Sequence, residues 1–306
     1  KPAELVPACG WALTEIISRC GLPAGVFNLV MGSGREVGQT LVDSALVNAL
    51  SFTGSVATGE HILQAAAARH AKVQLEMGGK NPLVVLADAD LEQAVECALQ
   101  GSFFSTGQRC TASSRLIVQA SVHDAFVARL RQRMSKLKVG HALERSTDIG
   151  PVVDADQLEQ NQSYLAVARN EGAEHVCGGE LLERSTPGHY MNPALLLAKP
   201  EHRVAREEIF GPVACVLRAD DYDHALALAN DTPFGLCAGI CTTSLKHATH
   251  FKRHADVGMT MVNLPTAGVD FHVPFGGRKA SSYGPREQGR YAAEFYTTVK
   301  TSYVFA

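Results

Sequence analysis

Long apolar runs and clusters of basic residues are both missing from this sequence. The apolar runs are short and interrupted, so neither a membrane span nor a signal peptide is recognisable. The formal net charge is −3, and no run of lysine or arginine occurs, which argues against a nucleic-acid surface. We therefore expect no membrane and no nucleic acid among the partners, and a cytoplasmic protein.

Paired cysteines are missing too. The eight cysteines are scattered, and none of them forms a Cys-x-x-Cys pair. Disulfide frameworks are typical of short secreted chains, and zinc sites are typical of closely spaced cysteines, so neither is expected here. Most of the cysteines have apolar neighbours, among which a reduced thiol behaves as a small hydrophobic side chain. The sequence predicts no metal site.

The sequence does contain alternating strand and helix patterns. Its length of 306 residues allows two domains. Strands are predicted at 26–32, 49–54, 72–79, 82–88, 114–119, 211–219, 236–243, 258–263 and 295–305. Helices are predicted at 4–20, 55–68, 90–101, 121–138, 221–230 and 244–255, and residues 141–203 are expected to be looser. This alternation predicts an α/β fold with parallel sheets.

One cysteine lies in a setting suited to chemistry. The stretch FFSTGQRCTASSR places Cys110 in a small, polar bend that follows Gly107. A catalytic cysteine needs a thiolate and hydrogen-bond donors for an oxyanion, and Arg109 beside it would favour the thiolate. The alternative is a buried, inert thiol, the commoner fate of a cysteine.

Other candidate residues lie where predicted strands end. Glu76 ends a strand and enters two glycines, where it can face a ligand crevice or be a solvated loop residue. Gly54 and Ser55 form a strand-to-helix turn whose first N–H groups suit a phosphate, unless it is an ordinary turn. Glu208 can accept hydrogen bonds from hydroxyls and Phe210 can wall a pocket, or both can simply cap a strand.

The stretches FTGS, LEMGGKNP, FFSTGQRCTASSR, EEIFGPV, ANDTPFGL and VPFGGRK together resemble the aldehyde dehydrogenase superfamily, in order and in spacing. The tail from residue 262 to residue 301 is most similar to the α-ketoglutaric semialdehyde (2,5-dioxovalerate) dehydrogenases. The resemblance implies NAD(P)-dependent oxidation of a small aldehyde, with Cys110 as nucleophile and Glu76 as general base. It also implies a homodimer or homotetramer.

The resemblance also implies roles for further residues. Expected at the cofactor, NAD with NADP as the alternative, are Lys1, Glu4, Gly34, Gly54, Ser55, Met77, Gly78, Glu208 and Phe210. A glutamate at position 4 suits the free 2′-hydroxyl of NAD. Expected at the substrate are Phe104, Arg109, Thr111, Phe275 and Arg278. Arg109 and Arg278 could bind a substrate carboxylate, although Arg109 could equally support the local backbone.

The resemblance divides the chain into part of a Rossmann-like cofactor domain (1–78), an α/β catalytic domain with a parallel sheet (79–290) and a subunit-bridging strand (291–306). The family's N-terminal region, with an oxyanion asparagine, has no counterpart here, so this chain alone is expected to be inactive and poorly self-sufficient. Two alternatives stay open. One is a non-catalytic structural or binding fragment, and the other is a CoA-acylating relative, against which Glu76 argues because hydrolysis needs a base.

Overall fold

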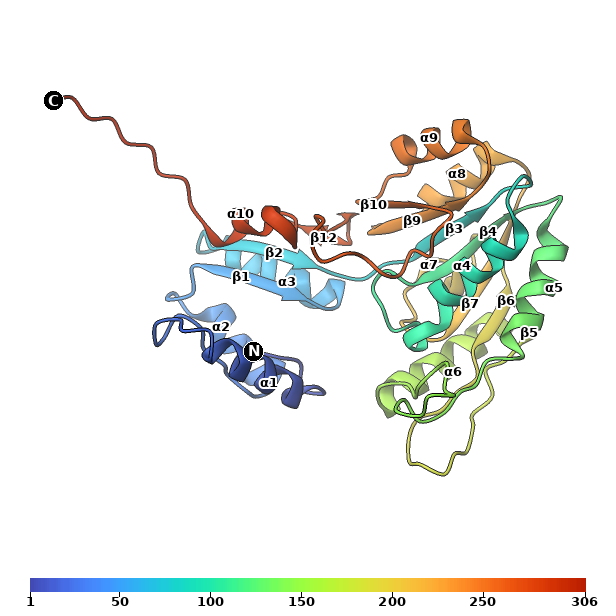
Figure 1. Cartoon of the computed structure of the whole chain (residues 1–306), viewed down its shortest axis with the longest axis horizontal. Helices are drawn as coiled ribbons and strands as arrows, with labels where there is room; N and C mark the ends of the chain where they lie inside the picture. The colour runs from blue at the N-terminus through green and yellow to red at the C-terminus, as the bar shows by residue number, and fades with distance from the viewer.

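The computed structural model describes the whole chain, residues 1–306, and contains two main sheets (Figure 1). The smaller sheet has the strand order β1-β2-β12, and the larger has the order β10-β9-β3-β4-β7-β6-β5. Its strands are β3 (Asn81–Val85), β4 (Ser113–Gln119), β5 (Glu174–Cys177), β6 (Ala194–Leu197), β7 (Val213–Ala219), β9 (Cys237–Cys241) and β10 (Met259–Val262). All of its pairings are parallel except that of β5 with β6, so the predicted α/β fold is confirmed.

Alternating side chains of the seven-stranded sheet build two hydrophobic cores. On β3, Leu83 and Val85 face one core and Val84 faces the other, which is the period-two alternation of a strand buried on both faces. The first core is covered by α4 (Leu91–Phe103) and α5 (His123–Met134). The second is covered by α6 (Ala155–Asn170), α7 (Arg203–Arg206), α8 (Tyr222–Asn230) and α9 (Leu245–His254). This rigid layered body carries the Cys110 bend at the start of β4.

The smaller sheet joins distant parts of the chain. Strands β1 (Ala49–Thr53) and β2 (Lys72–Glu76) pair in parallel, and α3 (Val56–Ala67) packs on them. The two-residue strand β12 (Ser282–Tyr283) pairs antiparallel with β2, so a late segment completes a sheet begun early. Figure 1 shows β12 and α10 (Ala292–Tyr296) beside β2.

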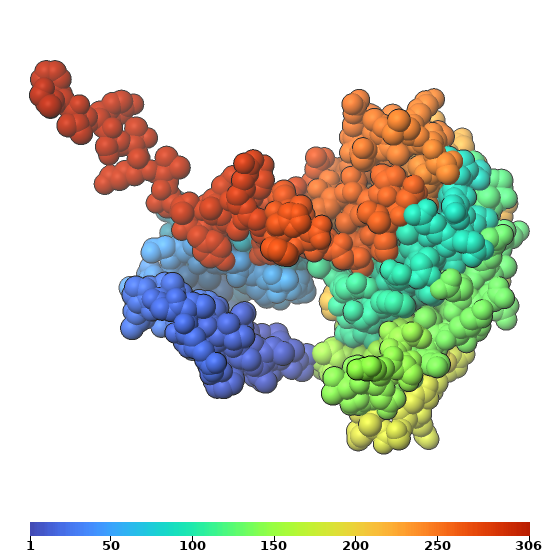
Figure 2. Space-filling view, in the orientation of Figure 1, coloured from blue at the N-terminus to red at the C-terminus, as the bar shows by residue number.

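The remaining elements are short, except for the first helix. They are α1 (Pro7–Ser18), η1 (Gly34–Gly38), α2 (Gln39–Asp43), η2 (Phe104–Gly107), β8 (Phe234–Gly235), β11 (Arg278–Lys279) and η3 (Gly289–Tyr291). Helix α1 buries none of its residues, and the space-filling view shows an opening between the N-terminal segment, in blue, and the larger lobe (Figure 2). No helix combines the length and the apolar character that crossing a membrane requires.

Three predicted features differ from the structure. Residues 26–32 form no strand: the smaller sheet ends at β1, whose only neighbour is β2, and 26–32 pair with no strand of either sheet. Residues 297–306 form no strand either, and they run outward and exposed in Figure 1, since a strand needs a partner backbone. Residues 141–203, expected to be looser, contain the sixteen-residue helix α6. The domain boundaries at 78 and 290 stay a prediction.

Candidate active site

The backbone that leads into Cys110 is wound in the left-handed sense. Ser105 and Thr106 have φ values of 54° and 56°, and Gly107 follows with 62°. A left-handed conformation is rare for a β-branched residue such as Thr106 and costs about 1–3 kcal/mol. The hydroxyl of Thr106 donates to Gln108 Oε1 over 2.8 Å, which helps to hold this turn. Such strain is typical of backbone that must aim a reactive side chain.

The thiol of Cys110 is half-buried, and its pKa is raised above the usual value of 9.0. Burial is the main cause, and the negative charge of Glu76 adds to it. The backbone N–H groups of Thr111 and of Cys110 itself act in the opposite sense and lower this pKa. These two N–H groups are donors of the kind that an oxyanion formed at Cys110 requires.

The prediction that Arg109 favours the thiolate stays a prediction: burial lowers the pKa of Arg109, and the charge of Cys110 acts in the opposite sense and raises it. The guanidinium Nη2 of Arg109 donates to the carbonyl oxygens of Gln100 and Phe104, over 2.9 and 3.0 Å. These bonds tie Arg109 to the end of α4 and to η2, which favours the local-support role over a substrate role. The other arginine proposed for the substrate, Arg278, lies exposed with its Nη1 3.4 Å from Asp256 Oδ1.

Glu76 ends β2 and is 4% exposed. Its Oε2 accepts a hydrogen bond of 2.6 Å from the hydroxyl of Ser282 in β12. Burial is the largest of several influences on its pKa, which is raised from 4.5 to about 7; the Ser282 bond and Arg286 lower it, and Glu287 raises it. A carboxyl group with a pKa near neutrality is suited to act as a general base.

The glycine turn after Glu76 joins the Cys110 bend to the Glu208 loop. A Cβ atom on Gly78 would lie 2.0 Å from Glu208 Oε2, and one on Gly79 would lie 2.8 Å from the carbonyl oxygen of Cys110. The N–H of Gly79 donates to Glu208 Oε1 over 2.9 Å. A side chain at Gly79 would meet the backbone of Cys110, and one at Gly78 would displace the carboxylate of Glu208. The two glycines therefore allow the Cys110 bend and the Glu208 side chain to approach this turn closely.

Phe210 and Phe275 belong to two loops at this turn. Phe210 has a φ of 56°, a left-handed conformation that a bulky side chain adopts only under constraint. Phe275 is half-buried, and its backbone pairs with that of Glu287. The next residue, Gly276, lies against Glu76, because a Cβ atom there would be 2.8 Å from Glu76 Oε1. The loop that carries Phe275 therefore reaches the carboxyl group of Glu76.

The residues expected at the cofactor fall into two groups, and the first of them lies at the smaller sheet. Gly54 follows β1 and donates its N–H to the carbonyl oxygen of Glu76 over 3.0 Å, and Ser55 caps α3. The side chain of Met77, by contrast, packs against Gly59 of α3 and belongs to the core. Only the backbone of Met77 is therefore available to a cofactor.

The second group lies near the start of the chain. Glu4 Oε1 accepts a hydrogen bond of 2.6 Å from the N–H of Gly34, beside a hollow of about 270 Å³. The side chain of Lys1 donates to the carbonyl oxygen of Pro2 over 2.6 Å. A carboxylate anchored through one oxygen at a hollow fits a sugar hydroxyl, and the capped start of α3 fits a phosphate. The residues present thus fit a dinucleotide.

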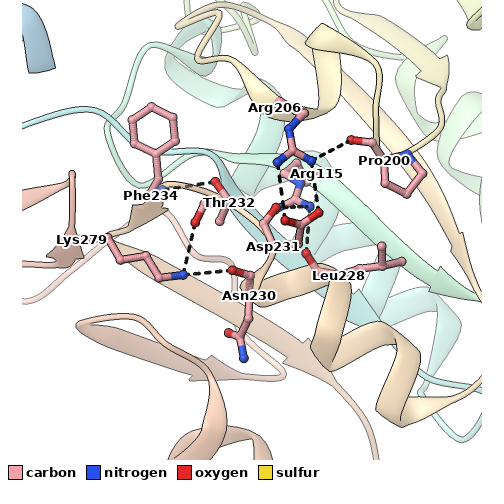
Figure 3. Close-up of polar contacts among 9 residues, drawn as sticks. All are labelled: Arg115, Pro200, Arg206, Leu228, Asn230, Asp231, Thr232, Phe234 and Lys279. Carbon is pink, nitrogen blue, oxygen red and sulfur yellow. Dashed lines mark hydrogen bonds and ion pairs between the residues drawn. The ribbon is translucent and has the colours of Figure 1, made fainter.

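The loop from Asn230 to Phe234, in the stretch ANDTPFGL, ties the surroundings of the site together (Figure 3). Arg206 Nη1 lies 3.1 Å from Asp231 Oδ2, next to the Glu208 loop. Lys279 Nζ donates to the carbonyl oxygens of Asn230 and Thr232, over 3.0 and 3.2 Å, next to the Phe275 loop. This stretch therefore fixes two site-forming loops and makes no direct contact with Cys110.

Several residues at the site have no signal in the sequence pattern. Ser282 and Arg286 approach Glu76 from more than 200 positions away. Lys80 is 1% exposed, and its amine is buried without a hydrogen-bond partner, so burial lowers its pKa to about 8. A charged residue following two glycines does not look like a core position. Only the folded chain shows that Lys80 lies inside.

Residues 1–302 match the family model described as "Aldehyde dehydrogenase family". The chain belongs to the aldehyde dehydrogenase family. It is 44% identical over 307 residues to the α-ketoglutaric semialdehyde dehydrogenase of Bacillus subtilis, which covers 99% of this chain and 63% of the relative. It is 42% identical to a betaine aldehyde dehydrogenase of Cereibacter sphaeroides, over 99% of this chain and 62% of the relative. The predicted resemblance is confirmed.

Among solved structures, the betaine aldehyde dehydrogenase of Staphylococcus aureus in complex with NAD⁺ superposes with a TM-score of 0.93 at 34% identity. The match covers 96% of this chain and 59% of that structure. This aldehyde dehydrogenase chain thus spans about 60% of the length of the relatives that it matches. What those relatives bind or oxidise bears on this chain only as a proposal.

The raised pKa of Glu76 predicts a pH-dependent cost in stability. The unfolded carboxyl group loses its proton near pH 4.5 and the folded one near 7, so the free energy of unfolding falls as the pH rises between these values. The full difference corresponds to about 3 kcal/mol. Because glutamine does not titrate, Glu76→Gln should stabilise the fold at pH 8 by about 2 kcal/mol more than at pH 5. Urea unfolding of both proteins at the two pH values measures this. A difference in the free energy of unfolding between variant and parent that is the same at pH 5 and at pH 8 contradicts it.

Proposed function

We propose that this chain carries the nucleophile and the general base of an NAD-dependent aldehyde dehydrogenase, which oxidises an aldehyde to a carboxylic acid. The observation that carries the proposal is the Gly78–Gly79 turn. It brings together a half-buried thiol, a carboxyl group with a pKa of about 7 and the Glu208 loop. The family membership and the NAD⁺ complex of a relative support the cofactor.

In the proposed mechanism, the thiolate of Cys110 attacks the carbonyl carbon and forms a thiohemiacetal. The N–H groups of Cys110 and Thr111 stabilise the negative oxygen. Glu4, the first turn of α3 and Glu208 would hold NAD, which would supply a hydride acceptor. Glu76 then takes a proton from water, which hydrolyses the thioester on Cys110. The need for this base favours hydrolysis over transfer to CoA.

The preference for NAD over NADP follows from Glu4. Its carboxylate already accepts the Gly34 N–H and suits a ribose hydroxyl, whereas a 2′-phosphate would meet a like charge. The cofactor residues named from the sequence keep these roles as part of the proposal, with Met77 contributing through its backbone. The proposal also includes a cytoplasmic location and self-association of the protein. The exposed apolar side chains of Val299, Tyr303 and Phe305 support pairing of the tail with a second copy.

For the substrate we propose an acidic semialdehyde of the α-ketoglutaric type. The support is the 44% identity to the Bacillus subtilis enzyme of that name, because the two arginines named from the sequence are engaged elsewhere. The betaine aldehyde dehydrogenases, at 42% identity, make a cationic aldehyde the competing choice.

NADH formation on the two aldehydes, which carry opposite charges, tests this choice. We expect kcat/KM for α-ketoglutaric semialdehyde to exceed that for betaine aldehyde at least about tenfold, which corresponds to about 1.4 kcal/mol of differential transition-state binding. A neutral aliphatic aldehyde serves as the reference. Preference for betaine aldehyde or for the neutral aldehyde contradicts the proposed substrate. Because this chain alone is expected to be inactive, the assay uses a protein that also carries the family's N-terminal region, and no NADH from any of the three aldehydes then contradicts the proposed reaction.

A further inference from the structure

Four consecutive backbone carbonyls at the nucleophile are held by buried side chains. The carbonyl oxygens of Cys110 and Ala112 both accept hydrogen bonds from Asn81 Nδ2, over 2.8 and 2.9 Å. The carbonyl between them, that of Thr111, accepts one of 2.7 Å from the hydroxyl of Thr266, and that of Ser113 accepts one from Ser102. The bend therefore has its carbonyls turned inward.

Asn81 is the member of this group that contacts two of the four carbonyls. It opens β3, is 2% exposed, and its Oδ1 accepts a hydrogen bond of 3.2 Å from the N–H of Cys237 in β9. Because one partner of the side chain is a backbone N–H and the other two are backbone carbonyls, the positions of the amide oxygen and nitrogen are determined. All the bonds of Asn81 thus connect three strands of the sheet, β3, β9 and the start of β4, to the bend.

The geometry of the peptide links Asn81 to the sulfur. In a planar trans peptide, the carbonyl of one residue and the N–H of the next point to opposite sides. When Asn81 holds the carbonyl of Cys110 toward the interior, the N–H of Thr111 in the same peptide is turned the other way. This N–H acts on the thiol, because it lowers the pKa of Cys110. We propose that Asn81 is a positioning residue that aims the Thr111 N–H at the sulfur of Cys110. This inference rests on the role of Cys110 proposed above.

The substitution Asn81→Asp tests the donor function at nearly constant shape. The carboxylate still accepts the Cys237 N–H, but it has no hydrogen to donate and faces two carbonyl oxygens. The peptide between Cys110 and Thr111 should rotate, and its N–H should lose its hold on the thiolate. Because the Thr111 N–H lowers the pKa of Cys110, the thiolate should then form only at higher pH.

The measurement is the rate at which iodoacetamide alkylates Cys110, followed by mass spectrometry of its peptide so that the other seven cysteines do not interfere. We expect Asn81→Asp to slow alkylation about tenfold at pH 7, and to reach the parent rate at high pH. Asn263→Asp is the matched control, since Asn263 also bridges a backbone carbonyl and a backbone N–H, both of Thr242, over 3.0 and 2.9 Å. Its pH profile should coincide with that of the parent.

The outcomes separate positioning from a purely structural role. A profile of Asn81→Asp that coincides with the parent's, or that is scaled by one factor at every pH, overturns the inference, because a change in accessibility has no pH dependence. If circular dichroism shows that Asn81→Asp is unfolded, Asn81→Ser keeps one donor and should show a smaller shift in the same direction; no shift overturns the inference. Alkylation needs neither NAD nor aldehyde, so a shift without aldehyde oxidation would contradict the proposed function alone.

Discussion

Replacing Cys110 with serine should abolish aldehyde oxidation, by at least about a thousandfold in kcat, while NAD binding stays within about twofold. Serine fits the same bend, because one oxygen replaces one sulfur and the backbone contacts of the bend are unchanged. Its hydroxyl group has far too high a pKa to become a nucleophile without a dedicated base. The loss would therefore come from chemistry rather than from folding.

NADH formation measures turnover, and fluorescence titration measures NAD binding. Both are made on a protein that also carries the family's N-terminal region. Cys177→Ser is the matched control, because Cys177 is also half-buried and lies in the edge strand β5, away from the site. It should leave turnover unchanged. Turnover of Cys110→Ser within tenfold of the parent would mean that another group attacks the aldehyde.

Substituting Glu76 with glutamine should slow steady-state turnover about 10²–10⁴-fold while a first burst of NADH remains. Hydride transfer precedes the need for an activated water, so one equivalent of NADH can form while the thioester on Cys110 accumulates in equal amount. In the parent, turnover should fall as the pH drops below about 7, where Glu76 takes up its proton. This limb of the pH profile should be missing from the variant.

Rapid-quench kinetics separates the burst from the steady state. Glu76→Asp retains a carboxyl group with a shorter reach and should be impaired less than Glu76→Gln. If the burst disappears together with turnover, Glu76 acts in forming the thiolate or in shaping the site, and the assignment as the hydrolytic base is wrong.

The sequence pattern predicts elements whose signal is local. Strand β2 and helix α3 lie close to their predicted bounds, and Ser55 and Asp90 are helix caps in the structure. Residues 26–32 carry an equally good strand pattern and still form none, because a strand exists only where a neighbour lies beside it. Helix α6 escapes prediction for the opposite reason. Its apolar side is narrow: it buries only Asn161 and Ala168 fully, while Leu158, Tyr164 and Leu165 pack against the core partly buried.

The candidate site also contains residues that the sequence pattern identifies and contacts that it does not. Cys110, Glu76 and Glu208 can be identified because each lies in a glycine-marked stretch at the end of an element, and the folded chain brings these stretches to one turn. The bonds from Ser282 to Glu76 and from Asn81 to Cys110 join residues 206 and 29 positions apart. Periodicity over a dozen residues contains no information on such pairs.

The measurement that tests the account most directly is the mass of the Cys110 peptide in Glu76→Gln, after the active protein has reacted with NAD and one equivalent of aldehyde. We predict an acyl group on Cys110, in an amount that equals the NADH burst, and its absence from Cys110→Ser. NADH formed without an adduct on Cys110, or with an adduct on a different cysteine, would contradict the assignment of nucleophile and base.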